Sequence, residues 1–353
     1  MNAIEVLSRL SLEGLMEKYQ SENKETATKR LVYELNIVDE WKKADFFLAA
    51  MEIANWIRSK GIVISNGHGA LPGSIIAYCI GLTAVDPIKY DLVFERFTNL
   101  DSDNAWFIWL LVPMQKLPEI KNYLFSNYPE FLDLIAIEGS AELDVLQNVN
   151  EKLDLDDIDF ADESVWGDLS VDDICNLIEA DLDNPPAFLK DIQIDGIETL
   201  ADVLSLYRPG PDEHIPAYIK GKQAPQKIEY ICEQLRPILE HTGGVVIYQE
   251  QVMRIMHDLA GFSWEQSNEL RKNLAKKKIL PAWRKNFIYG NEELKIAGCL
   301  ANGFSEEEAE QVWNLLTEMA YLGFNKSHAI GYAMDFYSQL WVRHYYSDRQ
   351  RMS

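Results

Sequence analysis

The chain has 353 residues, 47% of them hydrophobic, and a formal net charge of −23 at pH 7. This length and apolar content are sufficient for a large buried core in two or three domains, which excludes a wholly disordered chain. No stretch approaches the ~20 uncharged apolar residues of a membrane span, and the first residues lack the apolar core of a secretory signal. We therefore expect a soluble cytoplasmic protein with no membrane partner.

The cysteines and histidines lack the spacings of a metal site. Cys79, Cys175, Cys232 and Cys299 lie more than fifty residues apart and form no CxxC pair, and the six histidines form no HExxH motif. Such scattering argues against a zinc site or a disulfide framework. We expect the cysteines to be small buried apolar residues, and any metal to be bound by carboxylates.

Charge is unevenly distributed along the chain. Residues 151–183 contain thirteen acidic residues and one basic residue, whereas residues 271–290 contain seven basic residues and no acidic one. A negative net charge is unusual for a DNA-binding protein, because phosphate groups are neutralised by Lys and Arg. The basic run is therefore where we expect an anion to bind, be it DNA, a nucleotide or the chain's own acidic segment.

The first sixty residues are expected to form helices. Apolar residues recur at helical spacing within 44–60, and Gly61 follows as a stop. Residues 62–64 predict a short strand, which leads through the glycine loop 66–69 into a helix that ends near Leu82. Backbone N–H groups in such a loop can bind a phosphate, but a plain turn needs the same glycines, so both interpretations remain.

Two further apolar runs predict buried strands. The first covers residues 106–112, and the second covers 131–137 with Asp133 inside it. The acidic segment after them is expected to contain a helical fragment near 174–178 and to end at the Asn-Pro-Pro break at 184–186.

The chain beyond residue 197 is predicted to be mostly helical. Residues 251–262 place Val252, Ile255, Met256 and Leu259 on one face of a helix. A second helix is expected over 305–319, because Ser305 and Glu308 have the spacing of a capping box.

Five strings stand in order along the chain and together carry a resemblance. They are GHGALPGSIIAYCIGLTAVDPIKYDLVFERFTN, SLYRPGP, GGVVIYQEQVMRIM, ELRKNLAKKK and YLGFNKSHAIGYAM, which begin at residues 67, 205, 243, 269 and 321. Over about residues 30–346 the chain thereby resembles the alpha subunit of bacterial DNA polymerase III, the C-family replicative polymerase. The resemblance is weak between residues 100 and 195.

The resemblance implies a helix-rich α/β protein. A reduced palm like that of polymerase-beta nucleotidyltransferases, with N-terminal helices, would occupy residues 1–150, and a helical fingers domain would occupy residues 151–353. In the family, a Gly-Ser loop holds the incoming triphosphate and three aspartates hold two Mg²⁺ ions. The matching pair here is Gly73 and Ser74, and Asp133 matches the third aspartate.

The fingers strings imply further contacts with nucleotide and DNA. Tyr248, Val252, Met253, Phe324 and Tyr332 are expected in the core rather than at a substrate, because apolar residues at helical spacing usually face inward. The Gln249–Gln251 string is expected to tie helices together by hydrogen bonds, and His328 either packs or contacts phosphate. The implied nucleotide-binding residues are Arg208, Lys326 and His328, and the implied DNA-binding residues are Arg271, Lys272, Lys276, Lys277 and Lys278.

The metal site departs from the family pattern. The paired metal-binding aspartates and the thumb that follow FERF in the family are missing here, and His68 and Ala70 replace an Arg and a Ser of the phosphate loop. Asp101 and Asp103 are either a relocated pair of metal ligands or part of a turn. Asp154, Asp156, Asp157 and Asp159 are either ligands or a solvated acidic loop.

Three functional hypotheses follow, and the sequence leaves open whether the chain is an enzyme. The first is a catalytically degenerate polymerase homologue of DNA replication that binds DNA, a nucleotide or a replication protein. The second is an active DNA-directed DNA polymerase that uses Mg²⁺ on Asp101, Asp103 and Asp133. The third is an acidic interaction or decoy protein without a nucleic-acid role.

Overall fold

The N-terminal helices form as their apolar spacing predicts. Helix α1 (Ala3–Lys18) begins with a capping box between Asn2 and Glu5, and α3 (Ala44–Ser59) confirms the helix expected over 44–60. Gly61 follows with a φ of +68°, a conformation that suits glycine.

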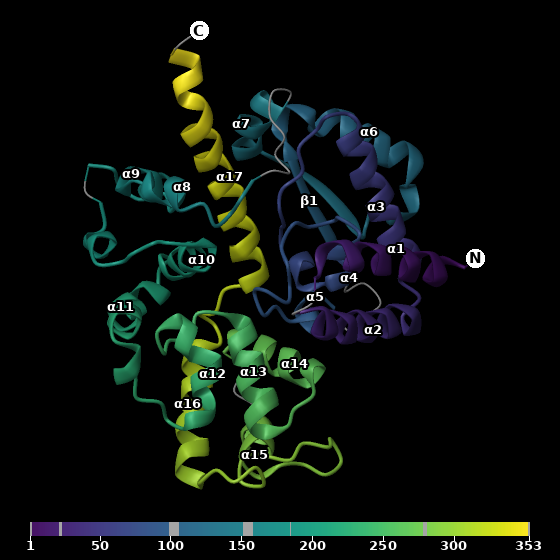
Figure 1. Ribbon diagram of the computed structural model, residues 1–353. Helices are drawn as coiled ribbons and strands as arrows, with labels where there is room; N and C mark the ends of the chain where they lie inside the picture. The colour runs from purple at the N-terminus through teal and green to yellow at the C-terminus, as the bar shows by residue number, and fades with distance from the viewer. Residues whose placement is uncertain are drawn as a thin grey trace. The chain divides into compact units, whose positions relative to one another are not determined.

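Figure 1 shows the computed structural model, which describes residues 2–20, 23–98, 106–150, 158–183, 185–277 and 281–351.

The prediction of a strand at residues 62–64 was wrong. The segment is not hydrogen-bonded to another strand; instead the Val63 N–H donates to the side chain of Gln147 at 3.0 Å. Ser65 then makes a single backbone bond of 3.0 Å to the carbonyl of Leu111. Three β-branched residues have high strand propensity, but a side-chain acceptor here takes the place of a neighbouring strand.

The helix after the glycine loop is shorter than predicted. A 3-10 turn, η1 (Leu71–Gly73), precedes α4 (Ile75–Cys79), and Gly81 with a φ of +75° ends the segment. Ser74 is the N-cap of α4, and its side chain accepts a hydrogen bond from the Ala77 N–H. The predicted loop-to-helix transition is thus present, with only one full turn of α-helix.

A two-stranded parallel sheet follows. Strand β1 (Ile108–Pro113) pairs with β2 (Ile135–Ser140), and helix α6 (Leu117–Asn127) lies between them in sequence. The first predicted strand is confirmed, but the second begins four residues later than predicted. Asp133 consequently lies in the turn before β2 and not inside the strand.

The chain divides into two compact units. The first unit comprises Met1–Leu169, Asp195–Glu198 and Ile330–Ser353, and the second comprises Ser170–Ile194 and Thr199–Ala329. These bounds differ from the predicted domains at 1–150 and 151–353, since residues 330–353 group with the first unit. The assignment of the two domains as palm-like and fingers-like stays a prediction.

The first unit is built on aromatic and aliphatic packing. Phe47, Phe94 and Phe97 each meet Trp106 edge-on, with ring centroids 5.7–6.1 Å apart. Helix α1 contacts α2, α3 and α4. The other helices of this unit are α2 (Lys24–Glu40), α5 (Phe94–Phe97), α7 (Ala141–Asn150), α8 (Glu163–Gly167) and most of α17 (Lys326–Arg351).

The second unit confirms the helices predicted beyond residue 197. Val252, Ile255, Met256 and Leu259 on α13 are all buried, and Ser305 and Glu308 form the predicted capping box of α16. Its helices are α9 (Val171–Leu177), most of α10 (Ile197–Leu206), α11 (Ile215–Gln223), α12 (Arg236–Leu239), α13 (Gln249–Ala260), α14 (Trp264–Ala275), α15 (Pro281–Tyr289) and α16 (Glu306–Met319).

Other sequence expectations concern burial and membranes. All four cysteines are free and buried, as predicted. Within the described ranges, each helix is too short or too polar to span a bilayer.

The described residues also contain short 3-10 helices besides η1: η2 (Met114–Lys116), η3 (Pro129–Phe131), η5 (Ala187–Lys190), η6 (Pro211–His214), η7 (Pro225–Lys227), η8 (Glu233–Leu235) and η9 (Glu240–Thr242).

Candidate functional site

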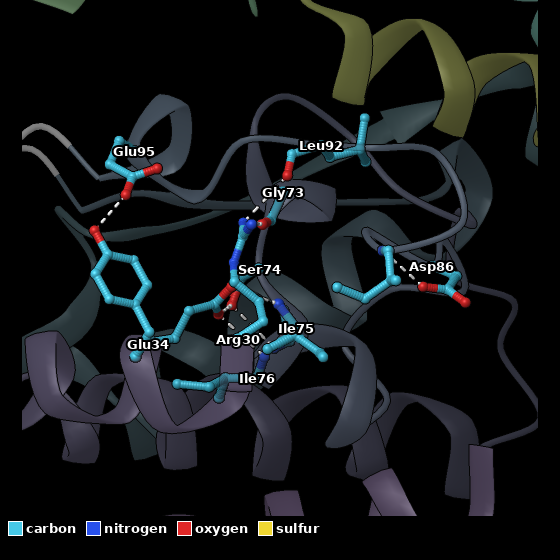
Figure 2. A network of polar contacts seen from close by, with 12 residues as sticks. Arg30, Glu34, Gly73, Ser74, Ile75, Ile76, Asp86, Leu92 and Glu95 are labelled. Carbon is cyan, nitrogen blue, oxygen red and sulfur yellow. Dashed lines mark hydrogen bonds and ion pairs between the residues drawn. The ribbon is translucent and has the colours of Figure 1, made fainter. Parts of the chain in front are cut away.

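The backbone amides at the start of α4 bind a carboxylate of the chain itself. Ser74 Oγ donates a 2.8 Å hydrogen bond to Glu34 on α2. The N–H groups of Ile75 and Ile76 donate to the same carboxylate at 3.0 and 3.2 Å, as Figure 2 shows. Glu34 therefore uses the hydroxyl and the two amides beside Gly73, where a triphosphate was predicted to bind.

An arginine completes this network. Arg30 lies one turn before Glu34 on α2, and the two side chains pair at 2.8 Å. The guanidinium also donates to the carbonyl oxygens of Gly73 and Leu92, at 3.0 and 3.2 Å. Burial raises the pKa of Glu34, and the charge of Arg30 together with the hydrogen bonds acts in the opposite direction. Both Glu34 and Ser74 have no exposed surface, so the carboxylate and the hydroxyl are closed to solvent, while Arg30 is partly buried.

The glycine loop is held by a buried aspartate on α17. Asp335 accepts hydrogen bonds from the backbone N–H and the side-chain amide of Asn66, at 2.6 and 2.8 Å. Thr83 Oγ1 donates to the Asn66 carbonyl at 2.6 Å. Asp335 was not predicted from the sequence, although an acidic residue in the otherwise uncharged stretch between Lys326 and Arg343 was a usable signal.

Asp335 makes the stability of the first unit depend on pH. Burial raises the pKa of its carboxyl to about 7, although both hydrogen bonds from Asn66 lower it. Between about pH 4 and pH 7 the folded chain thus binds a proton that the unfolded chain lacks, so stability falls as the pH rises through this window. We expect the unfolding free energy to drop by about 1–4 kcal/mol between pH 5 and pH 8 from this group alone.

Urea unfolding of Asp335→Asn at both pH values checks this expectation. The amide keeps the shape and an acceptor for Asn66 but does not titrate, so the variant should lose less stability between pH 5 and pH 8 than the parent protein. Equal losses in the two proteins would contradict the assignment.

One of the three predicted metal ligands, Asp133, lies within the described residues. Asp133 is exposed in its turn, while Asp101 and Asp103 lie outside the described residues. Across the ranges that the structure describes, no three His, Cys, Asp or Glu side chains are grouped so that they could hold a metal ion. The described residues thus show no Mg²⁺ site, and the set of Asp101, Asp103 and Asp133 stays a prediction.

Residues of the predicted nucleotide-binding set hold the second unit together. Arg208 donates to the carbonyl oxygen of Leu322 at 2.8 Å, and its guanidinium lies 4.5 Å from the ring centroid of Phe324. The backbone N–H of the buried Lys326 donates to the Glu250 carboxylate at 3.0–3.1 Å. Burial lowers the pKa of both Arg208 and His328. Gly73 and Ser74, from the same predicted set, lie in the first unit.

The Gln249–Gln251 string ties elements together, as predicted. Gln249 donates to the carbonyl of Gly323 at 3.0 Å, and Gln251 accepts from the backbone N–H groups of Ile247 and Tyr248. Tyr248, Val252 and Met253 are buried, which confirms their place in the core. Phe324 and Tyr332 are partly buried.

A second buried aspartate lies beside this string. Asp202 on α10 accepts hydrogen bonds from the hydroxyls of Tyr248 and Tyr218 at 2.6 and 2.9 Å. Burial raises its pKa to about 6, against the lowering by the two hydroxyls and by nearby Lys222 and Lys326. Asp202 was not predicted from the sequence, because an acidic residue within a predicted helix is usually exposed.

The structure separates the basic run into buried and exposed residues. Arg271 is buried and donates twice to Asn268 Oδ1, at 2.8 and 3.1 Å, and Lys272 on the same helix is partly buried. Lys276 and Lys277 are exposed at the end of α14, where cations are favourable next to the helix C-terminus. Lys278 lies outside the described residues, so two residues of the predicted DNA-binding set are seen to be exposed.

The described part of the acidic segment takes part in local structure. Asp162 caps α8, and its hydrogen bonds with Ser164 and Tyr345 lower its pKa to about 2. Asp168 pairs with His344 at 2.5 Å, and Asp159 Oδ1 accepts from the Ala161 N–H at 2.9 Å. The predicted cluster of Asp154, Asp156 and Asp157 lies outside the described residues.

Comparison with known proteins identifies the relatives of this chain. Residues 136–295 match the model of the bacterial DNA polymerase III alpha subunit finger domain. The chain is 26% identical to the DNA polymerase III subunit alpha of Bacillus subtilis over 94% of its own length and 41% of that protein. The chain is thus DNA polymerase III alpha-like. It is also 22% identical to the corresponding subunit of Ureaplasma parvum, over 97% of the chain and 48% of the relative.

The alignments locate this alpha-like chain within its relatives. It spans less than half of the length of the curated relatives that it matches. The Bacillus subtilis alignment runs over 467 positions, more than the 353 residues of the whole chain. More than a hundred aligned positions of that relative therefore have no counterpart here, which agrees in kind with the internal loss predicted from the sequence.

Proposed function

We propose that this alpha-like chain binds nucleic acid in DNA replication but does not carry out nucleotidyl transfer. The observation that supports this best is the Glu34 carboxylate on Ser74, Ile75 and Ile76. In the predicted palm these donors would have to bind the triphosphate. These donors already bind the buried carboxylate of Glu34, which is paired with Arg30. A phosphate would therefore have to displace Glu34 from this ion pair.

The loss of chemistry is supported by two further observations. The relative's alignment contains more than a hundred positions without counterpart, enough to hold the thumb and the paired aspartates that the sequence lacks after FERF. Asp133, the remaining match to the family's metal ligands, is exposed in a turn. We place the reduced polymerase-beta-like palm in the first unit, and propose a Mg²⁺ requirement only for the catalytic alternative.

Nucleic-acid binding is proposed for the exposed end of α14. Lys276 and Lys277 project from the second unit, in the region that matches the fingers. Within the ranges that the structure describes, no carboxylate lies at ion-pair distance from either ammonium group. As far as the described residues go, both charges are thus available for phosphate contacts. A cytoplasmic location, as expected from the sequence, goes with this proposal.

Primer extension beside a gel shift tests the proposal. On a labelled primer-template with dNTPs and Mg²⁺ or Mn²⁺, we expect no extension by the parent protein, and salt-sensitive binding of the same DNA without metal. Extension that disappears in Asp133→Asn would overturn the proposal and favour an active polymerase. Absence of both extension and binding would favour an acidic interaction protein with a protein partner.

A charge reversal tests the binding surface. The double variant Lys276→Glu and Lys277→Glu should weaken DNA binding at least about tenfold and lower the salt slope by about 1.8, because each phosphate contact contributes about 0.9. The matched control is Lys190→Glu with Lys227→Glu, two exposed lysines of the same unit. Equal effects of the two double variants would mean that net charge alone governs binding.

A further inference from the structure

An exposed tyrosine lies under a lysine at the end of α14. Tyr321 is 46% exposed, and the ammonium group of Lys277 lies 4.6 Å from the centroid of its ring. Lys276 precedes Lys277 and is exposed as well. One ammonium group therefore lies over an exposed ring of the second unit, and a second exposed lysine is its neighbour in the chain.

This pair differs from the other cation–ring pairs of the segment 321–326. Arg208 against Phe324 and Lys326 against Tyr248 involve buried or partly buried partners. Arg208 also donates to the Leu322 carbonyl, and the Lys326 backbone N–H donates to the Glu250 carboxylate. Lys277 and Tyr321 are both exposed, and a cation–π contact between exposed groups contributes only about 0.5–1 kcal/mol. The fold gains little from holding a large ring in water at this place.

The backbone sets the lysine over the ring. Lys277 follows the last turn of α14 with a φ of +55°, a left-handed conformation that a non-glycine residue adopts at some cost. Its N–H donates to the Leu274 carbonyl at 2.8 Å, which fixes this end of the helix. The backbone position of Lys277 is thus fixed by the end of the helix.

We propose that Tyr321, Lys276 and Lys277 form a binding site for single-stranded nucleic acid, in which a base stacks on the Tyr321 ring and the lysines contact the flanking phosphates. The inference deepens the proposed function and depends on it. A base can stack on a protein ring only when one of its faces is free, which a paired duplex does not offer outside its ends. Phosphates supply the negative charge that two neighbouring ammonium groups require.

Fluorescence anisotropy with labelled oligonucleotides tests the site. The ligands are a dT20 strand, the matching U20 strand and a 20-base-pair duplex. We expect Tyr321→Ala to weaken binding of the single strands roughly 5- to 150-fold, the effect of losing one stacked base. Tyr321→Phe should restore binding to within about twofold, because stacking needs the ring and not the hydroxyl. Stronger loss on dT20 or on U20 would assign the site to DNA or to RNA.

The lysine and a second tyrosine supply the controls. Lys277→Gln should reduce the salt slope on single strands by about 0.7, as one lost phosphate contact would. Tyr289→Ala removes another exposed ring of the same unit, 49% exposed and bonded through its hydroxyl to Glu306, and should leave binding unchanged. A photoreactive 5-iodouracil strand should crosslink to the peptide that contains Tyr321.

The outcomes separate this inference from the proposed function. Salt-sensitive binding of DNA that Tyr321→Ala leaves within twofold would overturn the stacking site and leave the proposed function intact. Equal weakening on duplex and single strands would overturn the single-strand assignment. No binding of any oligonucleotide by the parent protein would contradict both.

Discussion

Replacing Glu34 with alanine is expected to destabilise the first unit by about 3–5 kcal/mol, the usual cost of removing one partner of a buried ion pair. The change leaves Arg30, Ser74 and the amides of Ile75 and Ile76 without their common acceptor. Ser74, Ile75 and Ile76 have no exposed surface, so their donors would lose the carboxylate without readily gaining water, while Arg30 is partly exposed.

Urea unfolding followed by far-UV circular dichroism measures this effect. Glu25→Ala is the matched control, because Glu25 lies on the same helix and pairs with Lys29 through side chains that are 80% and 75% exposed. Such a surface pair contributes about 0–1 kcal/mol, so the control should unfold almost like the parent protein. A Glu34→Ala variant as stable as this control would show that the cluster does not hold α4.

Replacing Gly331 with alanine is expected to destabilise the first unit by about 3 kcal/mol, at the upper end of overpacking effects. A Cβ atom at Gly331 would lie 2.0 Å from the carbonyl oxygen of Gly67 and 2.6 Å from its carbonyl carbon. Both are backbone atoms, so the glycine loop itself must move. The gain of about 1 kcal/mol from placing alanine in a helix is too small to compensate.

The displacement should be visible at Asn66 as well as in stability. Asp335 lies one turn after Gly331 on α17, so a shifted loop lengthens the hydrogen bonds between Asn66 and Asp335. Hydrogen exchange of the Asn66 amide should accelerate together with the fall in melting temperature. Gly167→Ala is the control, since nothing lies within 4 Å of its added Cβ. A melting temperature unchanged in Gly331→Ala would contradict the close approach.

Local sequence patterns were sufficient to predict much of the helical architecture. Helix α3, the apolar face of α13 and the capping box of α16 follow from spacing within a few residues. Such features depend on neighbours one turn away, so a sequence pattern contains all of the interacting groups. The five strings also carried the polymerase III resemblance, which the comparison with the curated relatives supports.

The candidate site depended on groups that are distant in sequence. Glu34 meets Ser74 forty residues away, and Asn66 meets Asp335 across 269 residues. Sequence spacing could predict neither contact, because no local pattern states which carboxylate will reach a given loop. The prediction of a strand at 62–64 failed for the same reason, because the acceptor for the Val63 N–H is the side chain of Gln147, which is distant in sequence.

For the basic run at residues 271–290, the sequence likewise predicted one property and the tertiary structure decided another. Its composition alone determined that positive charge gathers at residues 271–290. Tertiary packing decided that Arg271 is buried on Asn268, that Arg284 pairs with Glu310, and that Lys277 lies over Tyr321. Which charges remain available to a ligand depends on the neighbours that folding brings to each one, and these come from parts of the chain that the run itself does not contain.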